Sequence, residues 1–590
     1  MAAPRTSIRA AYAKHTLHQH LLEKLNDVHS DHHNALPAAP AIPDDVKEKG
    51  RYQGRICIIG AGAAGLQIAM ALKLIGITNV DILEANNRVG GRCYTQQLPD
   101  DNDYPHNYYD IGAMRIPDIP WMKPTLDLID HLGLQTKKVP YIYKNPLAPC
   151  SYWYQNQPIT DDKFDSFMGP IAAKFTNNFD AAFAEWLTTE KDNYSTRAFL
   201  MAGPQSECPG GAPNPYDTAT AEIYDTSTGL FDQSLTETVI DYADFQAVGN
   251  NPWWRIDGGM QNITDTMQSF LASTSWPVAD SVPVTVKTKS PVIALSDDTT
   301  TNKISVTVAG QQPVEYDMVF NTTAMAPLQQ MNLQGLGLPN NILTGIRSLS
   351  YDRATKVAIR FTKPWWKLYG GVSRSDLPIS NVVYPSWDDG PDTPAVLMVS
   401  YSWAQDATRM GSLVPDYTLV PPSINDPIVA LCLQNLVTLW QNQPQKPSLK
   451  DLYSMYMTHH AWAWSHDPWT GGAFALFGPG QFKNVYPAFQ ELLCGDKFAM
   501  CGEALSAHHA WISGALDSAY QKVNLFLLSQ GRLDDRRKLK ESIFGGGEGR
   551  DIEEMDEELV KWTVLLGDGG GPKGWGDEYK LRKGKKKGSK

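Results

Sequence analysis

The sequence predicts an α/β fold with a helical insertion. Residues 51–117 read as strand, helix, strand and loop, and the turn after the first strand is rich in glycine. The pattern is mainly helical from Pro120 to Ala247 and rich in short strands over 282–323 and 351–403. Residues 471–530 are rich in glycine and then read as strand, turn and helix. Strands that alternate with helices in this way favour a parallel sheet covered by helices.

The composition supports a large folded chain. Of the 590 residues, 42% are hydrophobic and 20% are charged, which excludes a wholly disordered or fibrous protein and allows about four domain-equivalents. Seven basic residues fall in the last eleven, so the net charge of −12 divides into a basic end and a body with 45 basic and 64 acidic side chains. An acidic body argues against a nucleic-acid-binding core. The basic end is either a solvated terminus or an element for nuclear import or anion binding.

Both ends of the chain are predicted to be extensions. Residues 1–50 contain a helical segment near Ser7–Val28 and an Ala/Pro-rich linker, and they form an N-terminal extension or a removable pro-segment. The six histidines of this extension are solvated or, alternatively, bind a metal. Glycine clusters, an acidic run and the basic end predict a disordered tail over 545–590. No secretory signal and no run of ~18 or more apolar residues is visible, which predicts an intracellular protein or one exported by a non-classical route, without a membrane span.

Cysteine and histidine spacing predicts neither a disulfide scaffold nor a metal centre. The seven cysteines are an odd number, lie far apart and include no Cys-x-x-Cys pair. No His-Glu-x-x-His motif and no paired Cys/His spacing occurs either, so no metal site is predicted.

The first strand–helix–strand unit carries the pattern of a dinucleotide site. The apolar run Ile56–Ile59 leads into Gly60-Ala61-Gly62-Ala63-Ala64-Gly65, a helix follows to Ile75, and the strand Val80–Leu83 ends at Glu84. The first glycine allows the tight turn, the second lets a pyrophosphate approach the backbone, and the third lets helix and strand pack closely. The helix N-terminus offers N–H groups to phosphates, and Glu84 is placed to accept from ribose hydroxyls. The alternative is a glycine-rich turn without a ligand.

A second glycine turn follows the acid and narrows the choice of nucleotide. Glu84-Ala85-Asn86-Asn87-Arg88-Val89-Gly90-Gly91-Arg92 adds N–H groups and two arginines, of which Arg92 can reach a pyrophosphate. Here the sequence resembles the flavin amine oxidase family, whose members carry E-x-x-x-R-x-G-G-R after the glycine motif and bind FAD. The segment Phe498-Ala499-Met500-Cys501-Gly502-Glu503 resembles the second flavin motif of that family, and the resemblance covers roughly residues 51–530.

The resemblance implies a two-domain fold with an added helical domain. A Rossmann-like FAD-binding domain is expected from residues 51–119, 250–330 and 471–530, and a mixed-sheet substrate-binding domain from 331–470. The helical domain would comprise 120–249. The family also implies a homodimer.

The resemblance also implies which positions contact FAD, and that FAD is not covalently bound. Monoamine oxidases attach flavin through a cysteine in a Gly-Gly-Cys segment, whereas Gly471-Gly472-Ala473 stands at that place here. The implied cofactor-binding residues are Gly60, Gly62, Ala63, Ala64, Gly65, Glu84, Ala85, Arg88, Gly91, Arg92, Gly112, Ala113, Met114, Arg115, Val292, Trp464, Gly502, Glu503, Trp511 and Ile512.

The segment Asp110–Pro117 resembles the G-x-M-R-[LI]-P segment of L-amino-acid oxidases. The resemblance implies that Arg115 pairs with the substrate α-carboxylate, for which arginine offers a bidentate fork, and that the hydroxyl of Tyr401 is a second contact. Lys356 matches the family lysine that holds a water near flavin N5, and Trp511 and Trp464 match aromatic residues that enclose the substrate amine. The candidate catalytic residues are therefore Lys356, Arg115, Tyr401 and Trp511. The alternatives are a structural salt bridge for Arg115, a surface lysine for Lys356, and core positions for the aromatic residues.

The activity that the resemblance implies is oxidative deamination of L-amino acids. The substrate Cα gives a hydride to flavin N5, and the imino acid hydrolyses to a 2-oxo acid and ammonia. Molecular oxygen reoxidises the flavin, with release of hydrogen peroxide. The cofactor carries this chemistry, and the protein orients the substrate.

Two acids predict a preference for basic side chains. Asp352 shares a strand face with Lys356 by the period of two, and Asp241 lies near the entrance by family topology. The segments around them resemble L-lysine α-oxidase, where two acids and a small residue receive the lysine side chain. Trp403, Ala473 and Ala510 complete the side-chain pocket that this resemblance implies. The alternatives are a pair of Asp352 with Arg353, a helix cap at Asp241, and a broad-specificity L-amino-acid oxidase.

Two other interpretations of the whole chain stay open. Another enzyme on the same scaffold would be an amine or polyamine oxidase, or a monooxygenase that releases CO₂ and an amide. A protein of a different class would bind flavin and act by interaction, with its basic tail as the docking element. Turnover of an L-amino acid to an oxo acid and peroxide separates these possibilities.

Overall fold

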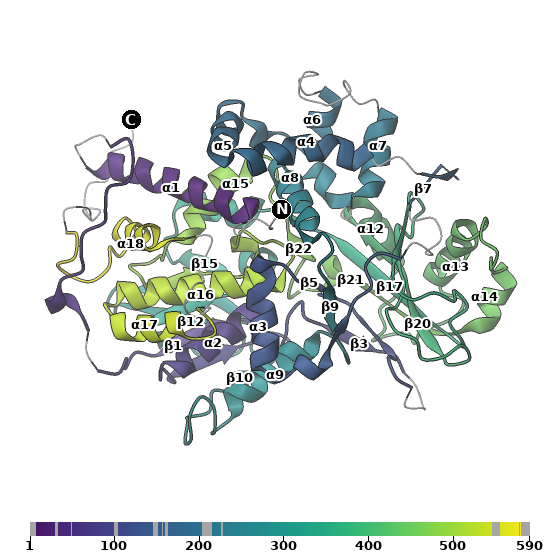
Figure 1. Ribbon diagram of the computed structural model, residues 1–590. Helices are drawn as coiled ribbons and strands as arrows, with labels where there is room; N and C mark the ends of the chain where they lie inside the picture. The colour runs from purple at the N-terminus through teal and green to yellow at the C-terminus, as the bar shows by residue number, and fades with distance from the viewer. Residues whose placement is uncertain are drawn as a thin grey trace. The chain divides into compact units, whose positions relative to one another are not determined.

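The computed structural model describes residues 7–29, 33–48, 50–99, 104–145, 152–155, 157–159, 163–202, 215–225, 228–545, 555–577 and 579 (Figure 1). The chain divides into two compact units, each built from stretches that are far apart in the sequence. Unit 1 contains residues 92–263 and 350–480, and unit 2 contains residues 5–91, 264–349 and 481–590.

These boundaries differ from those expected from the sequence. Three stretches expected in the FAD-binding domain belong to unit 1 instead: 92–119, 250–263 and 471–480. The helical stretch 120–249 shares that unit, whereas residues 331–349, expected in the substrate-binding domain, belong to unit 2. Strand pairing gives the physical reason. β9 (Trp253–Ile256) pairs with β5 (Ile116–Pro117) and β6 (Lys138–Pro140), and β22 (Phe474–Ala475) pairs with β16 (Tyr351–Asp352).

Unit 2 contains the parallel sheet that the sequence predicts. Its strand order is β10-β2-β1-β14-β23, and every neighbouring pair is parallel. Because both faces of such a sheet are covered, its inner strands read as continuous apolar runs. α2 and α16 pack side by side in this unit (Figure 1). A second sheet has the order β13-β12-β11-β15. The elements are α1 (Ile8–Val28), η1 (Asp44–Val46), β1 (Ile56–Ile59), α2 (Ala63–Leu74), β2 (Val80–Leu83), α9 (Gln261–Ala272, which begins in unit 1), β10 (Val286–Lys287), β11 (Val292–Asp298), β12 (Lys303–Val308), β13 (Val314–Tyr316), β14 (Met318–Asn321), α10 (Met325–Gln329), β15 (Asn332–Gly335), α11 (Asn340–Ser348), α15 (Gln481–Asn484), η7 (Tyr486–Gln490), β23 (Phe498–Met500), η8 (Glu503–Leu505), α16 (Ile512–Ser529), α17 (Leu533–Glu541) and α18 (Glu557–Leu565).

The N-terminal helix α1 is an integral part of unit 2. The helix expected near Ser7–Val28 is present, and its apolar residues Leu17, Leu21 and Leu25 are fully buried. Ser7 caps the helix by accepting from the backbone N–H of Ala10, and its Oγ lies 3.1 Å from Nε2 of His508. The extension therefore packs on the rest of the unit through apolar burial and specific polar contacts.

The C-terminal part has more structure than the sequence predicts. α18 is buried along most of its length, and the fully buried rings of Trp562 and Trp575 donate to the backbone oxygens of Pro37 and Pro40 at 2.8 and 3.0 Å. The prediction of disorder over 545–590 is therefore wrong for residues 555–577. Apolar side chains outweigh the glycine-rich composition there because they have a partner surface far away in the sequence. The basic end, 580–590, lies outside the described residues.

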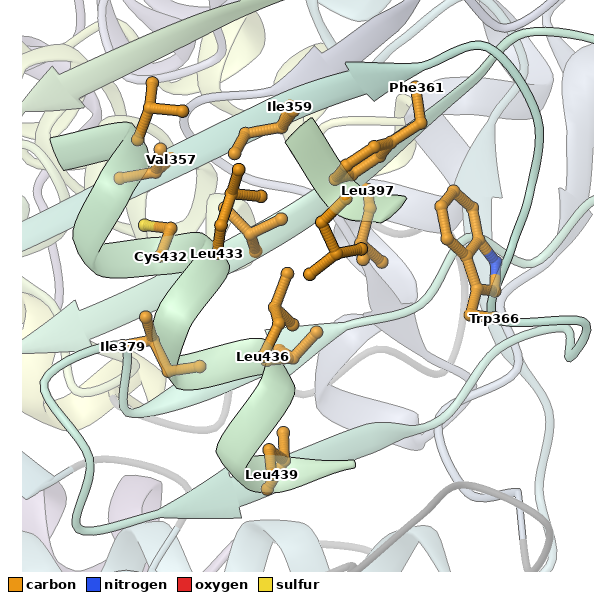
Figure 2. Close-up of a cluster of buried hydrophobic side chains, with 14 of the residues drawn as sticks. Val357, Ile359, Phe361, Trp366, Ile379, Leu397, Cys432, Leu433, Leu436 and Leu439 are labelled. Carbon is orange, nitrogen blue, oxygen red and sulfur yellow. The ribbon is translucent and has the colours of Figure 1, made fainter. Parts of the chain in front are cut away.

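Unit 1 is built on a seven-stranded sheet with the order β21-β17-β20-β19-β18-β7-β8. Val357, Ile359 and Phe361 alternate along β17 and point to one face, where helix α13 covers them with Cys432 and Leu433 (Figure 2). The opposite face of β17 therefore carries Lys356. The elements are β3 (Thr95–Gln97), β4 (Tyr108–Asp110), β5, η2 (Pro120–Met122), α3 (Lys123–His131), η3 (Gln135–Lys137), β6, β7 (Tyr152–Tyr154), β8 (Gln157–Pro158), α4 (Lys163–Asn177), α5 (Phe179–Thr188), η4 (Lys191–Asn193), α6 (Thr196–Ala202), α7 (Pro215–Tyr224), η5 (Thr228–Asp232), α8 (Leu235–Val248), β9, β16, β17 (Ala354–Phe361), β18 (Val372–Ser375), β19 (Asn381–Val383), β20 (Ala395–Trp403), α12 (Ala404–Gly411), α13 (Pro427–Leu439), α14 (Leu449–Met455), β21 (Tyr456–Ala463), η6 (Trp464–His466) and β22.

Neither a disulfide nor a membrane-spanning helix is found in the described part of the chain. The five cysteines in the described ranges (57, 93, 432, 494 and 501) form no disulfide, while Cys150 and Cys208 lie outside those ranges. None of the helices in the described part of the chain combines the length and apolarity that a bilayer crossing requires.

Candidate active site

The first glycine turn of unit 2 has the geometry that its sequence requires. Gly60 has a φ of +100°, and a Cβ on Gly65 would lie 2.0 Å from the backbone oxygen of Gly60. These glycines therefore provide the tight turn and the close packing of α2 on β1. Gly62 precedes α2 without a side-chain cap, and a Cβ there would meet open space. The first turn of α2, which contains Ala63 and Ala64, thus presents N–H groups and the positive end of its dipole to that space.

Glu84 and the second glycine turn are tied to the first turn. The Glu84 carboxylate accepts from the N–H groups of Ala61 at 2.7 Å and Asn86 at 2.8 Å, which flank Gly62 and Ala85 respectively. These two bonds leave acceptor capacity on the carboxylate for ribose hydroxyls. The Arg88 guanidinium donates to two backbone oxygens of its own turn, at 3.1 and 2.9 Å, so it stabilises the turn that ends in Gly91.

The remaining cofactor positions of unit 2 lie at strand ends. Val292 opens β11, two residues after Ser290, whose N–H donates to the backbone oxygen of Glu84 at 2.8 Å. Gly502 follows β23 with a φ of +126°, and Glu503 accepts from the N–H of Ala510 at 2.8 Å. Trp511 and Ile512 begin α16, which, like α2, has no side-chain cap. Two uncapped helix starts and two glycine turns at the carboxyl ends of parallel strands fit the pyrophosphate and ribose of FAD.

In unit 1, Lys356 is a buried cation held by backbone oxygens. It is 2% exposed, and its Nζ donates to the backbone oxygens of Asp110 at 3.0 Å and Gly112 at 2.7 Å. Burial lowers the pKa of Lys356 to about 7; the charge of Asp110 opposes this shift, and that of Arg115 adds to it. The Sδ atom of Met114 lies 3.6 Å from Nζ. The alternative of a surface lysine is therefore excluded.

The segment that holds Lys356 packs on Arg92. A Cβ on Gly112 would lie 1.7 Å from the backbone oxygen of Arg92, and the N–H of Ala113 donates to that oxygen at 3.2 Å. The Arg92 guanidinium donates to the backbone oxygen of Ala473 at 3.2 Å, so it joins two predicted site segments. Trp464 is 2% exposed and donates from Nε1 to the backbone oxygen next to Gly112, that of Ile111, at 3.2 Å.

Arg115 lies among aromatic rings instead of carboxylates. Within the described residues its guanidinium forms no ion pair with an acid, so the expected alternative of a structural salt bridge is not found. Ring faces attract a cation but leave its N–H donors available for an anion. The rings lie at centroid distances of 4.8 Å for Tyr143, 5.6 Å for Trp253, 5.9 Å for Phe245 and 6.0 Å for Tyr141.

Tyr401 joins Arg115 and Lys356. It is the cross-strand partner of Lys356 in β17 and β20, and the Lys356 Nζ lies 4.6 Å from its ring centroid. Burial raises the pKa of Tyr401, and the charge of Arg115 opposes this rise, which places the two within electrostatic reach. Three of the four candidate catalytic residues therefore come together in unit 1.

Asp352, Trp403 and Ala473 also lie together. The N–H of Ala473 donates to the backbone oxygen of Asp352 at 2.9 Å, and the Trp403 ring centroid lies 4.5 Å from that of Phe474, the cross-strand partner of Asp352. Asp352 is 3% exposed, and its Oδ2 has no hydrogen-bond partner among the described residues. Burial raises the pKa of this carboxyl to about 7, although the charge of Arg353 acts in the opposite direction. A pair with Arg353 therefore does not satisfy Asp352.

Asp241 is linked to Asp352 only through intermediate residues. It is 7% exposed on α8, one turn after Glu237. Glu237 accepts from the N–H of Phe477 at 3.2 Å, three residues beyond Phe474, which pairs with Asp352. Asp241 and Asp352 thus belong to neighbouring segments of unit 1. Trp511 and Ala510 belong to unit 2, so their place beside the substrate residues stays a prediction.

Sequence reasoning missed the rings around Arg115 and one further acid. Tyr141, Tyr143, Phe245 and Trp253 come from separate segments, and no local motif marks them; the pairs of aromatic residues in their segments were the only signal. Asp232, on η5, adds to the rise in the pKa of Asp352. Because Asp232 lies far from Asp352 in the sequence, the sequence gave no indication of this electrostatic effect.

The fold and the site define a flavoprotein oxidoreductase. A family model described as flavin containing amine oxidoreductase matches residues 63–525, and the chain belongs to this family. Membership implies FAD as the cofactor, which agrees with the fit of the unit 2 turns described above.

Two relatives and one solved structure show which proteins the chain resembles in sequence and in fold. A Dictyostelium discoideum protein whose name provisionally describes a bifunctional amine oxidase is 33% identical over 540 residues, which are 82% of this chain and 47% of that protein. The chain thus spans about half the length of that relative. L-amino-acid oxidase 4 of Hebeloma cylindrosporum is 31% identical over 529 residues, 80% of this chain and 82% of that protein. A solved structure of a putrescine oxidase mutant has a TM-score of 0.59 at 18% identity, covering 83% of this chain and 99% of that one, which shows the shared α/β amine oxidase fold.

Proposed function

We propose that the protein is an FAD-dependent L-amino-acid oxidase that converts an L-amino acid, O₂ and water into a 2-oxo acid, ammonia and hydrogen peroxide. The observation that carries the proposal is the Arg115 guanidinium, which has no acidic partner among the described residues and lies within reach of Tyr401 and Lys356. A substrate α-carboxylate supplies the missing partner, and a guanidinium holds it in two hydrogen bonds. The name of the Hebeloma relative supports the same substrate class.

Each residue of the group has a role that follows from its chemistry. When bound, FAD would supply the hydride acceptor for this chemistry. Arg115 and the Tyr401 hydroxyl hold the carboxylate and so orient the Cα–H bond. Lys356 uses two N–H groups on backbone oxygens, and its third faces the weak acceptor Sδ of Met114 at 3.6 Å, which a water would replace. The buried Trp464 excludes bulk water from this group, which favours the neutral substrate amine.

We further propose that the substrate side chain is basic. The buried Oδ2 of Asp352 lacks a donor among the described residues, and a lysine or arginine side chain would provide one. Asp241 adds a second acid, and Trp403 and Ala473 form the walls. A cationic side chain would lower the pKa of Asp352 and so ionise it on binding. Comparable turnover of L-amino acids with basic, neutral and acidic side chains would contradict this proposal and indicate a broad-specificity oxidase.

Two further properties are proposed from sequence position. FAD is non-covalent, because Ala473 stands where a thioether cysteine would be needed. Acid precipitation should then leave all yellow colour in the supernatant; colour in the pellet would contradict the proposal. The protein is a homodimer, as its resemblance to the family implies, and light scattering of the holoenzyme tests this.

The decisive experiment is an oxygen-uptake panel on the purified holoenzyme. It should include all L- and D-amino acids, cadaverine and L-lysinamide, with assays for ammonia, 2-oxo acid and CO₂. We expect turnover of L-amino acids with equal ammonia and peroxide, and little turnover of cadaverine. Amine turnover without amino-acid turnover would indicate an amine oxidase, and CO₂ with an amide would indicate a monooxygenase.

A further inference from the structure

We propose that unit 1 carries a second anion site, at Arg255, which binds a small monocarboxylate. The site adjoins the proposed amino-acid site, since Met114 and the Arg115 neighbour Tyr141 line its cavity, but its existence does not depend on the proposed function. Its elements are a cavity, a buried arginine that forms no ion pair within the described residues and a buried hydroxyl whose O–H is free to donate.

The cavity has a volume of about 50 Å³ and none of Arg115, Lys356, Tyr401 and Asp352 lines it. A single water requires about 10–15 Å³ by the same kind of measure, so the space holds roughly four waters or one small carboxylate. β4, β9 and β20 and the segment after β19 form its walls. The residues that matter for the argument are Tyr108, Asp110, Tyr141, Arg255 and Trp387.

Arg255 is a buried charge that forms no ion pair within the described residues. It is 6% exposed, its Nε has no hydrogen-bond partner among the described residues, and no acid there pairs with it. One terminal nitrogen donates to the Tyr108 hydroxyl. The acid in its neighbourhood, Asp110, already accepts from Thr95 at 2.6 Å and from the N–H of Met260 at 2.9 Å. Burying a charge without an ion pair is unfavourable, so an anion in the cavity would stabilise this arrangement.

The guanidinium is held in a fixed plane by stacking. Its central carbon lies 3.6 Å from the ring centroid of Trp387, and the His106 ring lies 4.4 Å from the same centroid at an interplanar angle of 17°. Two groups so close to one centroid must lie on opposite faces, since they would otherwise overlap. His106 is fixed in turn by Asp389 at 2.7 Å. The arginine is therefore ordered before any ligand binds, which reduces the entropy lost on binding.

Tyr141 provides a second donor. It is 8% exposed, and its hydroxyl oxygen accepts from the Arg115 guanidinium, which leaves its own O–H free to donate to a ligand. A planar guanidinium edge and a hydroxyl match the two oxygens of a carboxylate. The small volume and the nearby Asp110 disfavour a phosphate or another multiply charged ion. Tyr141 also lies 6.0 Å from Arg115, so the cavity and the proposed carboxylate clamp share one wall.

The test uses formate and the holoenzyme, with thermal unfolding as the readout. We expect formate, at constant ionic strength with chloride, to raise the unfolding temperature of the wild type in a saturable way. Arg255→Gln should weaken formate binding at least about tenfold, because it removes the charged partner of a buried ion. Arg347→Gln, which changes an exposed arginine of unit 2, should bind formate as the wild type does.

A second variant separates this site from the proposed amino-acid site. Formate protection should persist in Arg115→Gln, and a crystal soaked in formate or bromide should show the ion beside Arg255. Protection that is lost in Arg115→Gln but retained in Arg255→Gln would overturn the proposal. So would a wild type that shows no saturable response. If Arg255→Gln fails to fold, Tyr141→Phe gives the same test with a smaller expected loss.

Discussion

The ammonium of Lys356 lies over the ring of Tyr401, 4.6 Å from its centroid, and the two residues are direct partners in the antiparallel pair of β17 and β20. This register places the cation and the phenol on one face of the sheet, while α13 covers the other face. The same Nζ is fixed by the backbone of the Asp110–Arg115 segment. One lysine therefore links the strand that carries Tyr401 to the segment that carries Arg115.

The first prediction concerns the pH dependence of stability. The folded-state pKa of Lys356, about 7, lies below the ordinary value of 10.5 because of burial. Between these values the unfolded state binds more protons, so this residue makes stability rise with pH. The difference in free energy of unfolding between wild type and Lys356→Met should rise by up to about 1.4 kcal/mol per pH unit across that window. Below pH 6 it should be flat.

Urea unfolding from pH 6 to pH 10 measures this difference. Lys363→Met is the matched control, since Lys363 is exposed just beyond β17, and its curve should run parallel to that of the wild type. Parallel curves for Lys356→Met as well would mean that Lys356 is not buried as a titrating group.

The second prediction concerns the carboxylate clamp. Arg115→Gln should lower kcat/KM for L-amino acids at least about thirtyfold, which is about 2 kcal/mol of lost transition-state stabilisation. L-Lysinamide, which lacks the carboxylate, should be affected far less. Arg409→Gln, an exposed arginine of the same unit, serves as the control. An equal loss for the acid and the amide would indicate a structural role for Arg115.

The third prediction concerns side-chain selectivity. Asp352→Asn should reduce the ratio of kcat/KM for L-lysine to that for L-methionine at least about tenfold, because a buried carboxyl loses its cationic partner. In the wild type, KM for lysine should fall as the pH rises through about 7, where Asp352 ionises, and KM for methionine should not follow. Asp232→Asn should have a smaller effect. An unchanged ratio in Asp352→Asn would remove the basis for a basic preference.

The same carboxyl predicts an opposite trend in stability to that of Lys356. Its folded-state pKa lies above the ordinary value of 3.8, so its contribution is fully present below pH 4 and is lost as the pH rises through about 7. Asp352→Asn should therefore be more stable relative to the wild type at pH 8 than at pH 5. Thermal unfolding at the two pH values measures this.

Local rules predicted the dinucleotide turn well. Gly60 and Gly65 have the roles that the motif assigns them, because a turn and a helix start depend on neighbours within a few residues. The prediction that Asp352 and Lys356 share one face of a continuous strand was less accurate than the prediction of the glycine turn. The strand breaks at Arg353, and Asp352 pairs with β22 instead of continuing β17, yet its carboxyl remains in the neighbourhood of Tyr401.

Contacts between segments that are distant in the sequence could not be predicted from local patterns. No property of Lys356 in its own strand indicates that its acceptors are the backbone oxygens of Asp110 and Gly112, almost 250 positions earlier. The C-terminal tail was misjudged for the same reason, since the acceptor of Trp562 is the backbone of Pro37. Burial of such side chains depends on a surface that composition alone does not reveal.

The last prediction concerns Ser7, which caps α1 and makes one further contact that the cap does not explain. Its Oγ accepts from the N–H of Ala10 at 2.9 Å and lies 3.1 Å from Nε2 of the buried His508, three residues before Trp511. Ser7→Ala should lose about 1 kcal/mol for the cap and a further 1–2 kcal/mol for the imidazole contact. Asn178→Ala removes an exposed cap of α5 and should lose only the first amount. Equal losses in denaturant unfolding of the two holoenzyme variants would show that His508 gains nothing from α1. A larger loss for Ser7→Ala, together with a changed tryptophan fluorescence spectrum, would show that α1 positions the segment before Trp511.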